Sequence, residues 1–189
     1  METKKDEIAH FVEVFKNNYE MDDLTPDYLE RMACLVVTYK NLFDEFKLDV
    51  ISAECWTATP VMFEGLAPCA VYGILNDLGY IVSCESDMHC AMTMVLLESA
   101  SFGEKRPFLG EFTVRHPENK NAELLWHCGP FPYSMRAEDS KPKLFNTKPS
   151  FRAKDGKYTI DESKCVGCGR CLAICPKDAI LSRQDEAPA

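Results

Sequence analysis

The chain has 189 residues, a formal net charge of −9 and 46% hydrophobic residues, which fits one ordinary domain with a small addition. The acidic balance argues against a general nucleic-acid-binding protein, because binding to phosphates needs clustered lysine and arginine. No run of about 18 uncharged apolar residues and no signal-peptide pattern occurs, so we expect a cytoplasmic protein without a membrane span. Ten cysteines in that compartment indicate metal chemistry rather than a disulfide framework.

The first quarter of the chain has the periodicity of amphipathic helices. Residues 5–18 place their apolar side chains on one helical face. A long helix is predicted to begin at Pro26, because Thr25 is a suitable N-cap and proline suits the first helical position. Its apolar stripe continues from Leu29 to Phe46.

Strands and helices then alternate. Residues 48–55 and 80–86 are short runs rich in β-branched residues and predict buried strands, while residues 68–79 and 87–101 predict helices. This alternation predicts an α/β fold with a parallel sheet.

The later part of the chain has a different character. Residues 107–116 and 122–129 predict a β hairpin, or part of a barrel, around the turn at 117–121. Residues 129–157 are rich in proline, lysine and serine and are interpreted as an extended linker. Two further short strands are predicted at 157–161 and 178–182.

Acidic residues gather where the predicted strands end. Glu64 follows the first strand, Glu85 and Asp87 follow the second, and His127 lies near the end of the hairpin. Ligands of open parallel sheets bind outside the carboxyl ends of the strands. Two carboxylates and a neutral imidazole suit Mn²⁺, Mg²⁺ or Zn²⁺. The alternative is structural, with Asp87 as a helix cap and His127 as a satisfied core histidine.

Three stretches resemble the second half of the L-fucose/L-arabinose isomerase superfamily: CW at 55–56, GLAPCAVYGILNDLGYIVSCESD at 65–87 and LLWHCGPFPYS at 125–134. The closest similarity is to the fucose-isomerase-like branch, which has CEGD where this chain has CESD. The resemblance covers residues 25–145. It implies an isomerase-like core, oligomers with sites at subunit contacts, and an N-terminal domain that residues 1–24 replace with one short helix.

The resemblance also implies a site. Glu64, Asp87 and His127 would bind one divalent cation, usually Mn²⁺, and Glu64 and Asp87 would be the catalytic pair that moves protons in aldose–ketose isomerisation. Glu85 is interpreted as a supporting charge beside the site rather than as a ligand.

The C-terminal cysteines have the spacing C-x2-C-x2-C-x3-C and are followed by proline; they are Cys165, Cys168, Cys171 and Cys175. This spacing is typical of a bacterial [4Fe-4S] cluster, whereas zinc sites more often pair two CxxC units across a longer gap. A zinc knot and free thiols are the alternatives. Because only one motif occurs, Cys175 closes its own cluster, reaches a cluster in a second copy, or is replaced by an upstream cysteine.

The predicted organisation is an N-terminal helix (1–24), a fucose-isomerase-like domain (25–145), a linker (146–156) and a half-ferredoxin α+β segment (157–184). Three functions follow: a metal-dependent sugar isomerase with an attached cluster, an electron-transfer subunit with a docking scaffold, or a structural subunit of a larger complex. The expected partners are a second copy or a hetero-complex, a redox partner and a sugar substrate.

Overall fold

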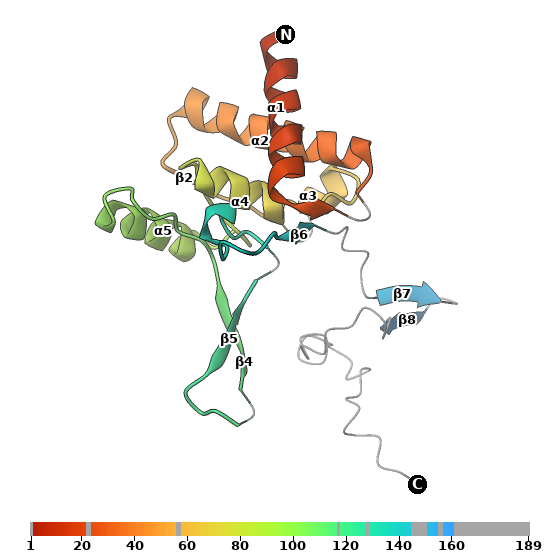
Figure 1. The fold of residues 1–189 in the computed structure, drawn as a ribbon. Helices are drawn as coiled ribbons and strands as arrows, with labels where there is room; N and C mark the ends of the chain where they lie inside the picture. Colours follow the sequence, from red (N-terminus) through yellow and green to blue (C-terminus); the bar gives the residue numbers. More distant parts are fainter. Residues whose placement is uncertain are drawn as a thin grey trace. The chain divides into compact units, whose positions relative to one another are not determined.

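The computed structural model describes residues 2–21, 24–55, 58–116, 118–127, 129–144, 151–154 and 157–160. The chain forms two units, Met1–Asn146 and Thr147–Ala189, each of which is described by itself (Figure 1). Among the described residues, no helix has the length and apolar character needed to cross a membrane.

Two long helices begin the first unit. The helix α1 (Glu2–Asn18) packs on α2 (Pro26–Phe46), and the core between them includes the fully buried Phe15 and Val36. At the start of α2, the Thr25 side chain accepts a hydrogen bond from the backbone N–H of Tyr28 at 3.2 Å. The predicted cap and the predicted first residue of this helix are therefore confirmed.

A short parallel sheet follows. Strand β2 (Val50–Ser52) pairs with β3 (Ile81–Ser83) in parallel, and β3 is buried along its whole length. The helices α3 (Ala58–Met62) and α4 (Cys69–Asp77) lie between these strands in sequence, and α5 (Met88–Ala100) follows β3. Both α4 and α5 contact β3, so the predicted α/β fold class is confirmed.

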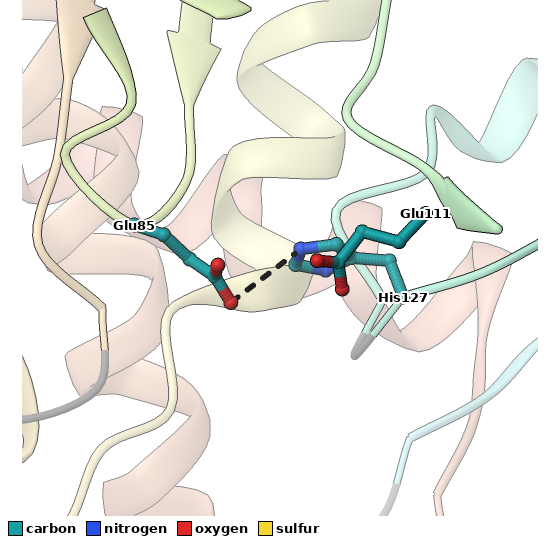
Figure 2. A group of neighbouring side chains, drawn as sticks. All are labelled: Glu85, Glu111 and His127. Atoms are coloured by element: carbon teal, nitrogen blue, oxygen red, sulfur yellow. Dashed lines mark ion pairs between the residues drawn. The ribbon is translucent and has the colours of Figure 1, made fainter. Parts of the chain in front are cut away.

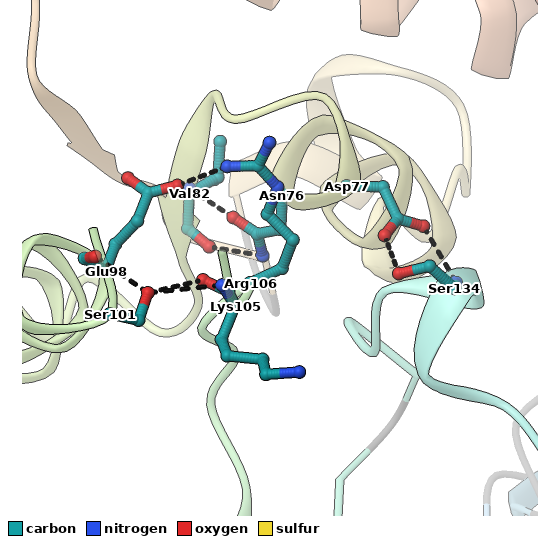
Figure 3. A network of polar contacts seen from close by, with 8 residues as sticks. All are labelled: Asn76, Asp77, Val82, Glu98, Ser101, Lys105, Arg106 and Ser134. Carbon is teal, nitrogen blue, oxygen red and sulfur yellow. Dashed lines mark hydrogen bonds and ion pairs between the residues drawn. The ribbon is translucent and has the colours of Figure 1, made fainter. Parts of the chain in front are cut away.

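A buried asparagine ties α4 to the sheet. The Asn76 side chain donates a hydrogen bond to the carbonyl of Val82 at 3.2 Å and accepts one from its N–H at 2.8 Å (Figure 3). Nearby, Arg106 donates a hydrogen bond to Glu98 of α5 at 2.6 Å. These contacts fix the end of β3, where the predicted site residues begin.

The predicted hairpin is present as β4 (Glu111–Arg115) and β5 (Glu123–Trp126), which pair antiparallel. The register pairs Glu111 with Trp126 and Phe112 with Leu125, and it shifts between Phe112 and Val114. Such a shift marks a β-bulge, which bends the strand. Because the first pair lies at the base of the hairpin, Glu111 is a near neighbour of His127.

The segment after the hairpin is more ordered than predicted. A 3-10 helix, η1 (Tyr133–Met135), lies on α4, and Ser134 donates hydrogen bonds from its N–H and its hydroxyl to Asp77 (Figure 3). A Cβ at Gly73 would lie 2.5 Å from the carbonyl oxygen of Phe131, so glycine is needed for this close approach. Strand β6 (Lys143–Leu144) then pairs in parallel with β1 (Glu20–Met21).

In the second unit, β7 (Phe151–Lys154) and β8 (Lys157–Ile160) pair antiparallel. Strand β8 lies where a strand was predicted, whereas β7 falls in the predicted linker. The predicted strand at 178–182 and the four cysteines of the motif lie outside the described residues.

Candidate functional site

Three side chains converge at the carboxyl end of β3. Glu85 comes from the loop after β3, Glu111 begins β4, and His127 directly follows β5 (Figure 2). One ligand atom from each residue lies within 4.8 Å of the corresponding atoms of the other two. The group therefore joins the parallel sheet to the base of the hairpin.

The imidazole is the inner member of this group. The His127 side chain is 1% exposed, and its Nε2 lies 3.8 Å from Oε1 of Glu85, whose side chain is 26% exposed. Glu111 is also partly exposed. A ligand from solvent would thus meet the two carboxylates first, with the histidine behind them.

The residue types and spacing fit a divalent cation. Ligand atoms on opposite sides of a cation with bonds of about 2.2 Å are about 4.4 Å apart, so atoms within 4.8 Å need only a small adjustment. Carboxylate oxygens suit hard ions such as Mn²⁺ and Mg²⁺, and imidazole suits Zn²⁺ and other transition metals.

The backbone of the Glu85 loop has an uncommon conformation. Glu85 and Ser86 both have positive φ, 62° and 53°, although neither is glycine. Hydrogen bonds from Ser86 N–H to the carbonyl of Ala53 and from Asp87 N–H to that of Cys84, both at 3.1 Å, hold the turn. Such strain persists where the surroundings over-determine it, frequently at functional sites.

The predicted ligands take different places. His127 lies in the group, whereas Asp87 caps α5 by accepting a hydrogen bond from Cys90 N–H at 2.8 Å. Glu64 is exposed in the turn after α3 and has a φ of 52°. Among the described residues, Glu64 and Asp87 belong to no such group. Glu85, interpreted as a supporting charge, is a member, and Glu111 was not predicted.

Two thiols lie directly behind Glu85. Cys84 and Cys55 are both buried, and their side chains share a hydrogen bond. This hydrogen bond raises the pKa of the Cys84 thiol, and burial and the negative charge of Glu85 act in the same direction. Cys69, the first residue of α4, also interacts electrostatically with Cys84.

Comparison with known proteins identifies the C-terminal part. Residues 158–181 match the family model of the 4Fe-4S binding domain. The cysteine motif therefore belongs to a ferredoxin-type iron–sulfur segment, and the prediction of a [4Fe-4S] cluster is supported.

Two kinds of relative match larger parts of the chain. The sulfoquinovose isomerase of Priestia aryabhattai is 36% identical over 91 residues, which are 47% of this chain and 19% of the isomerase. That of Alkalicoccus urumqiensis is 33% identical over 119 residues, 62% of this chain and 25% of the isomerase. The chain thus spans about a fifth to a quarter of these isomerases.

The second kind of relative is one component of a reductase, and it is larger than this chain. This component of the tetrathionate reductase of Salmonella typhimurium (strain LT2) is 25% identical over 129 residues, which are 64% of this chain and 46% of the relative. No solved structure gives a significant match.

Proposed function

We propose that residues 25–144 form a divalent-cation site of the aldose–ketose isomerase type, joined to the C-terminal [4Fe-4S] segment. The observation that carries this proposal is the convergence of Glu85, Glu111 and His127 within 4.8 Å at the carboxyl end of β3. The similarity to sulfoquinovose isomerases supports the same class of chemistry. We take Mn²⁺ as the first cation to test, because the carboxylates supply hard oxygen ligands.

The three side chains would have different roles. The cation would supply Lewis acidity toward a sugar carbonyl and hold two neighbouring oxygens. Glu85 and Glu111, the partly exposed members, would move a proton between the carbon beside the carbonyl and the carbonyl carbon itself. His127, almost fully buried, would position the ion from the protein side. The reaction moves no net electrons, so it makes no demand on the cluster.

The substrate class is an aldose. Sulfoquinovose is the first candidate, because it is named in the isomerases that match this chain. Since the chain spans only part of those proteins, we propose that a second copy or another subunit completes the walls of the pocket. The predicted homo-oligomer or hetero-complex would supply them.

Titration with Mn²⁺, followed by electron paramagnetic resonance on the anaerobic full chain, tests the site. Glu85→Gln, Glu111→Gln and His127→Ala should each lower the Mn²⁺ affinity by about tenfold or more, because each removes a ligand. Mn²⁺ prefers carboxylate to thiolate, so the cysteine motif should interfere little.

Glu64→Gln and Asp87→Asn are the matched controls and also test the ligand set predicted from the resemblance. Asparagine is as good an N-cap as aspartate, so Asp87→Asn should leave α5 and the Mn²⁺ affinity nearly unchanged. A larger loss of affinity for Glu64→Gln and Asp87→Asn than for Glu85→Gln and Glu111→Gln would restore the original set.

Turnover is tested separately, by proton NMR in deuterated buffer. A Mn²⁺-loaded chain should exchange the hydrogen beside the carbonyl of the aldose and form the ketose, and Glu85→Gln should abolish both. Mn²⁺ binding without exchange for any aldose would leave the metal site in place and reject the isomerase activity.

Electron transfer is the second candidate function. It is favoured by the match of residues 158–181 to the 4Fe-4S binding domain and by the similarity to the reductase component. In this case the first unit would be a docking scaffold for a redox partner. Reversible bleaching by dithionite and electron delivery to a partner enzyme, without sugar exchange, would favour it over the isomerase.

A further inference from the structure

We propose that Cys55 and Cys84 form a redox-active dithiol, in which a low-molecular-weight disulfide oxidises the pair to an intramolecular disulfide. This site is separate from the cysteine motif at 165–175 and does not depend on the proposed isomerase activity. It rests on the direct contact between the two side chains, which share a hydrogen bond within the core.

The parallel sheet brings the two cysteines together. Cys84 is the first residue after β3, and the pairing of Ser52 with Ser83 makes Ala53 its neighbour on the other strand. The hydrogen bond from Ala53 N–H to the Ser83 carbonyl, at 2.9 Å, continues the ladder beyond the strands. The sulfur atoms are therefore held by strand pairing rather than by chance contact of two loops.

A local turn completes the arrangement by redirecting the chain after Ala53. The carbonyl of Glu54 accepts a hydrogen bond from the Thr59 hydroxyl at 2.5 Å, and its carboxylate accepts one from Ala58 N–H at the start of α3. These contacts bend the chain at Cys55, so that its side chain remains beside Cys84 instead of continuing along the sheet. Two cysteines can be bridged only when their backbones are this well fixed at short range.

The two cysteines differ in access. Cys55 is 8% exposed and Cys84 is 0% exposed, so Cys55 is the thiol that an incoming reagent meets. Its thiolate would attack the reagent and release one thiol, and Cys84 would then displace the second. Both S–H bonds break, one S–S bond forms, and the reagent's disulfide takes up two electrons and the two protons.

Peptide mapping of the full chain tests the proposal. Anaerobic protein is equilibrated in buffers with increasing ratios of oxidised to reduced glutathione, quenched with iodoacetamide, denatured and cleaved after glutamate. Cleavage places Cys55 in residues 55–64, Cys84 with Cys69 in residues 65–85, and Cys90 in residues 86–98. Mass spectrometry then measures each peptide and any linked pair.

We expect the linked pair 55–64 with 65–85, two hydrogens lighter than the sum of its parts, to increase to most of the chain as the buffer becomes oxidising. Cys69→Ser should retain it, which assigns the bond to Cys84, and Cys84→Ser should abolish it. Cys34→Ser, on α2, is the matched control and should change nothing. The wild type needs no variant to fold: if its Cys55 carries only glutathione or iodoacetamide at every ratio, the proposal is overturned, as it is if Cys69→Ser loses the link.

Discussion

Replacing Ser86 with glycine should stabilise the first unit. Ser86 has a φ of 53° and an exposed side chain, so its left-handed backbone conformation gains nothing from packing of that side chain. Glycine adopts this conformation without a steric penalty. The fucose-isomerase-like pattern that the chain resembles has glycine at the same position of CESD.

The size of the effect follows from two opposing terms. The left-handed conformation costs a residue with a Cβ about 1–2 kcal/mol, while glycine loses about 0.5–1 kcal/mol more backbone entropy on folding. The net gain in the free energy of unfolding is about 0.5–1 kcal/mol. For a unit of this size, that gain raises the Tm by about 1–4 °C.

Urea unfolding followed by far-ultraviolet circular dichroism measures this gain, since all five α-helices of the described residues lie in the first unit. The hydrogen bond from Ser86 N–H to Ala53 is kept in the variant. Ser99→Gly, an exposed position in α5 with no positive φ, is the matched control and should lose about 0.5 kcal/mol. If Ser86→Gly destabilises the unit as much as Ser99→Gly, the turn at 85–86 is not left-handed in solution.

Three further predictions concern the cluster, the core and assembly. Anaerobic protein should be brown with broad absorption near roughly 400 nm, and Cys168→Ser should bleach it; colourless protein with stoichiometric zinc would reject the cluster. Asn76→Leu should lower the free energy of unfolding by about 2–4 kcal/mol, because it leaves the N–H and carbonyl of Val82 without their partner, and an unchanged urea midpoint would contradict this. Light scattering of the cluster-loaded chain should give a mass above 21.4 kDa, whereas a monomer that keeps its cluster would exclude a cluster shared between copies.

The local signals in the sequence were sufficient for the helices and the parallel strands. Thr25 and Pro26 defined the start of α2, and the β-branched runs located β2 and β3 to within a few residues. These features depend on capping and periodicity, which act over one or two helical turns. The same reasoning reached His127, because it follows a strand directly.

The carboxylate members of the candidate site were beyond that reasoning. Beyond β3 the left-handed residues Glu85 and Ser86 end the extended backbone, so the alternation of a strand no longer says which carboxylate points to the site. Asp87 looked equivalent to Glu85 in sequence, but its capping of α5 uses its carboxylate. Glu111 needed the register of the hairpin. Counting outward from Asn119, the centre of the predicted turn, would have placed Glu111 opposite His127.

The hairpin of the second unit was missed for a simpler reason. Phe151–Lys154 and Lys157–Ile160 flank the pair Asp155 and Gly156, which themselves lie outside the described residues. An Asp-Gly pair between two short strands is a strong hairpin signal. The high content of lysine and proline around it favoured the interpretation as a linker.

The convergence at the base of β4 and β5 has a consequence for how the molecule unfolds. An isolated two-stranded hairpin is marginally stable in water. Glu111 and His127 flank its first pair, and Glu85 belongs to the buried sheet, so an ion held by all three would fasten the hairpin to the core. Ion binding would then be linked to local unfolding, and its free energy would appear as protection of the β4–β5 amides from hydrogen exchange. The least supported strands of the unit would become as slow to exchange as β3.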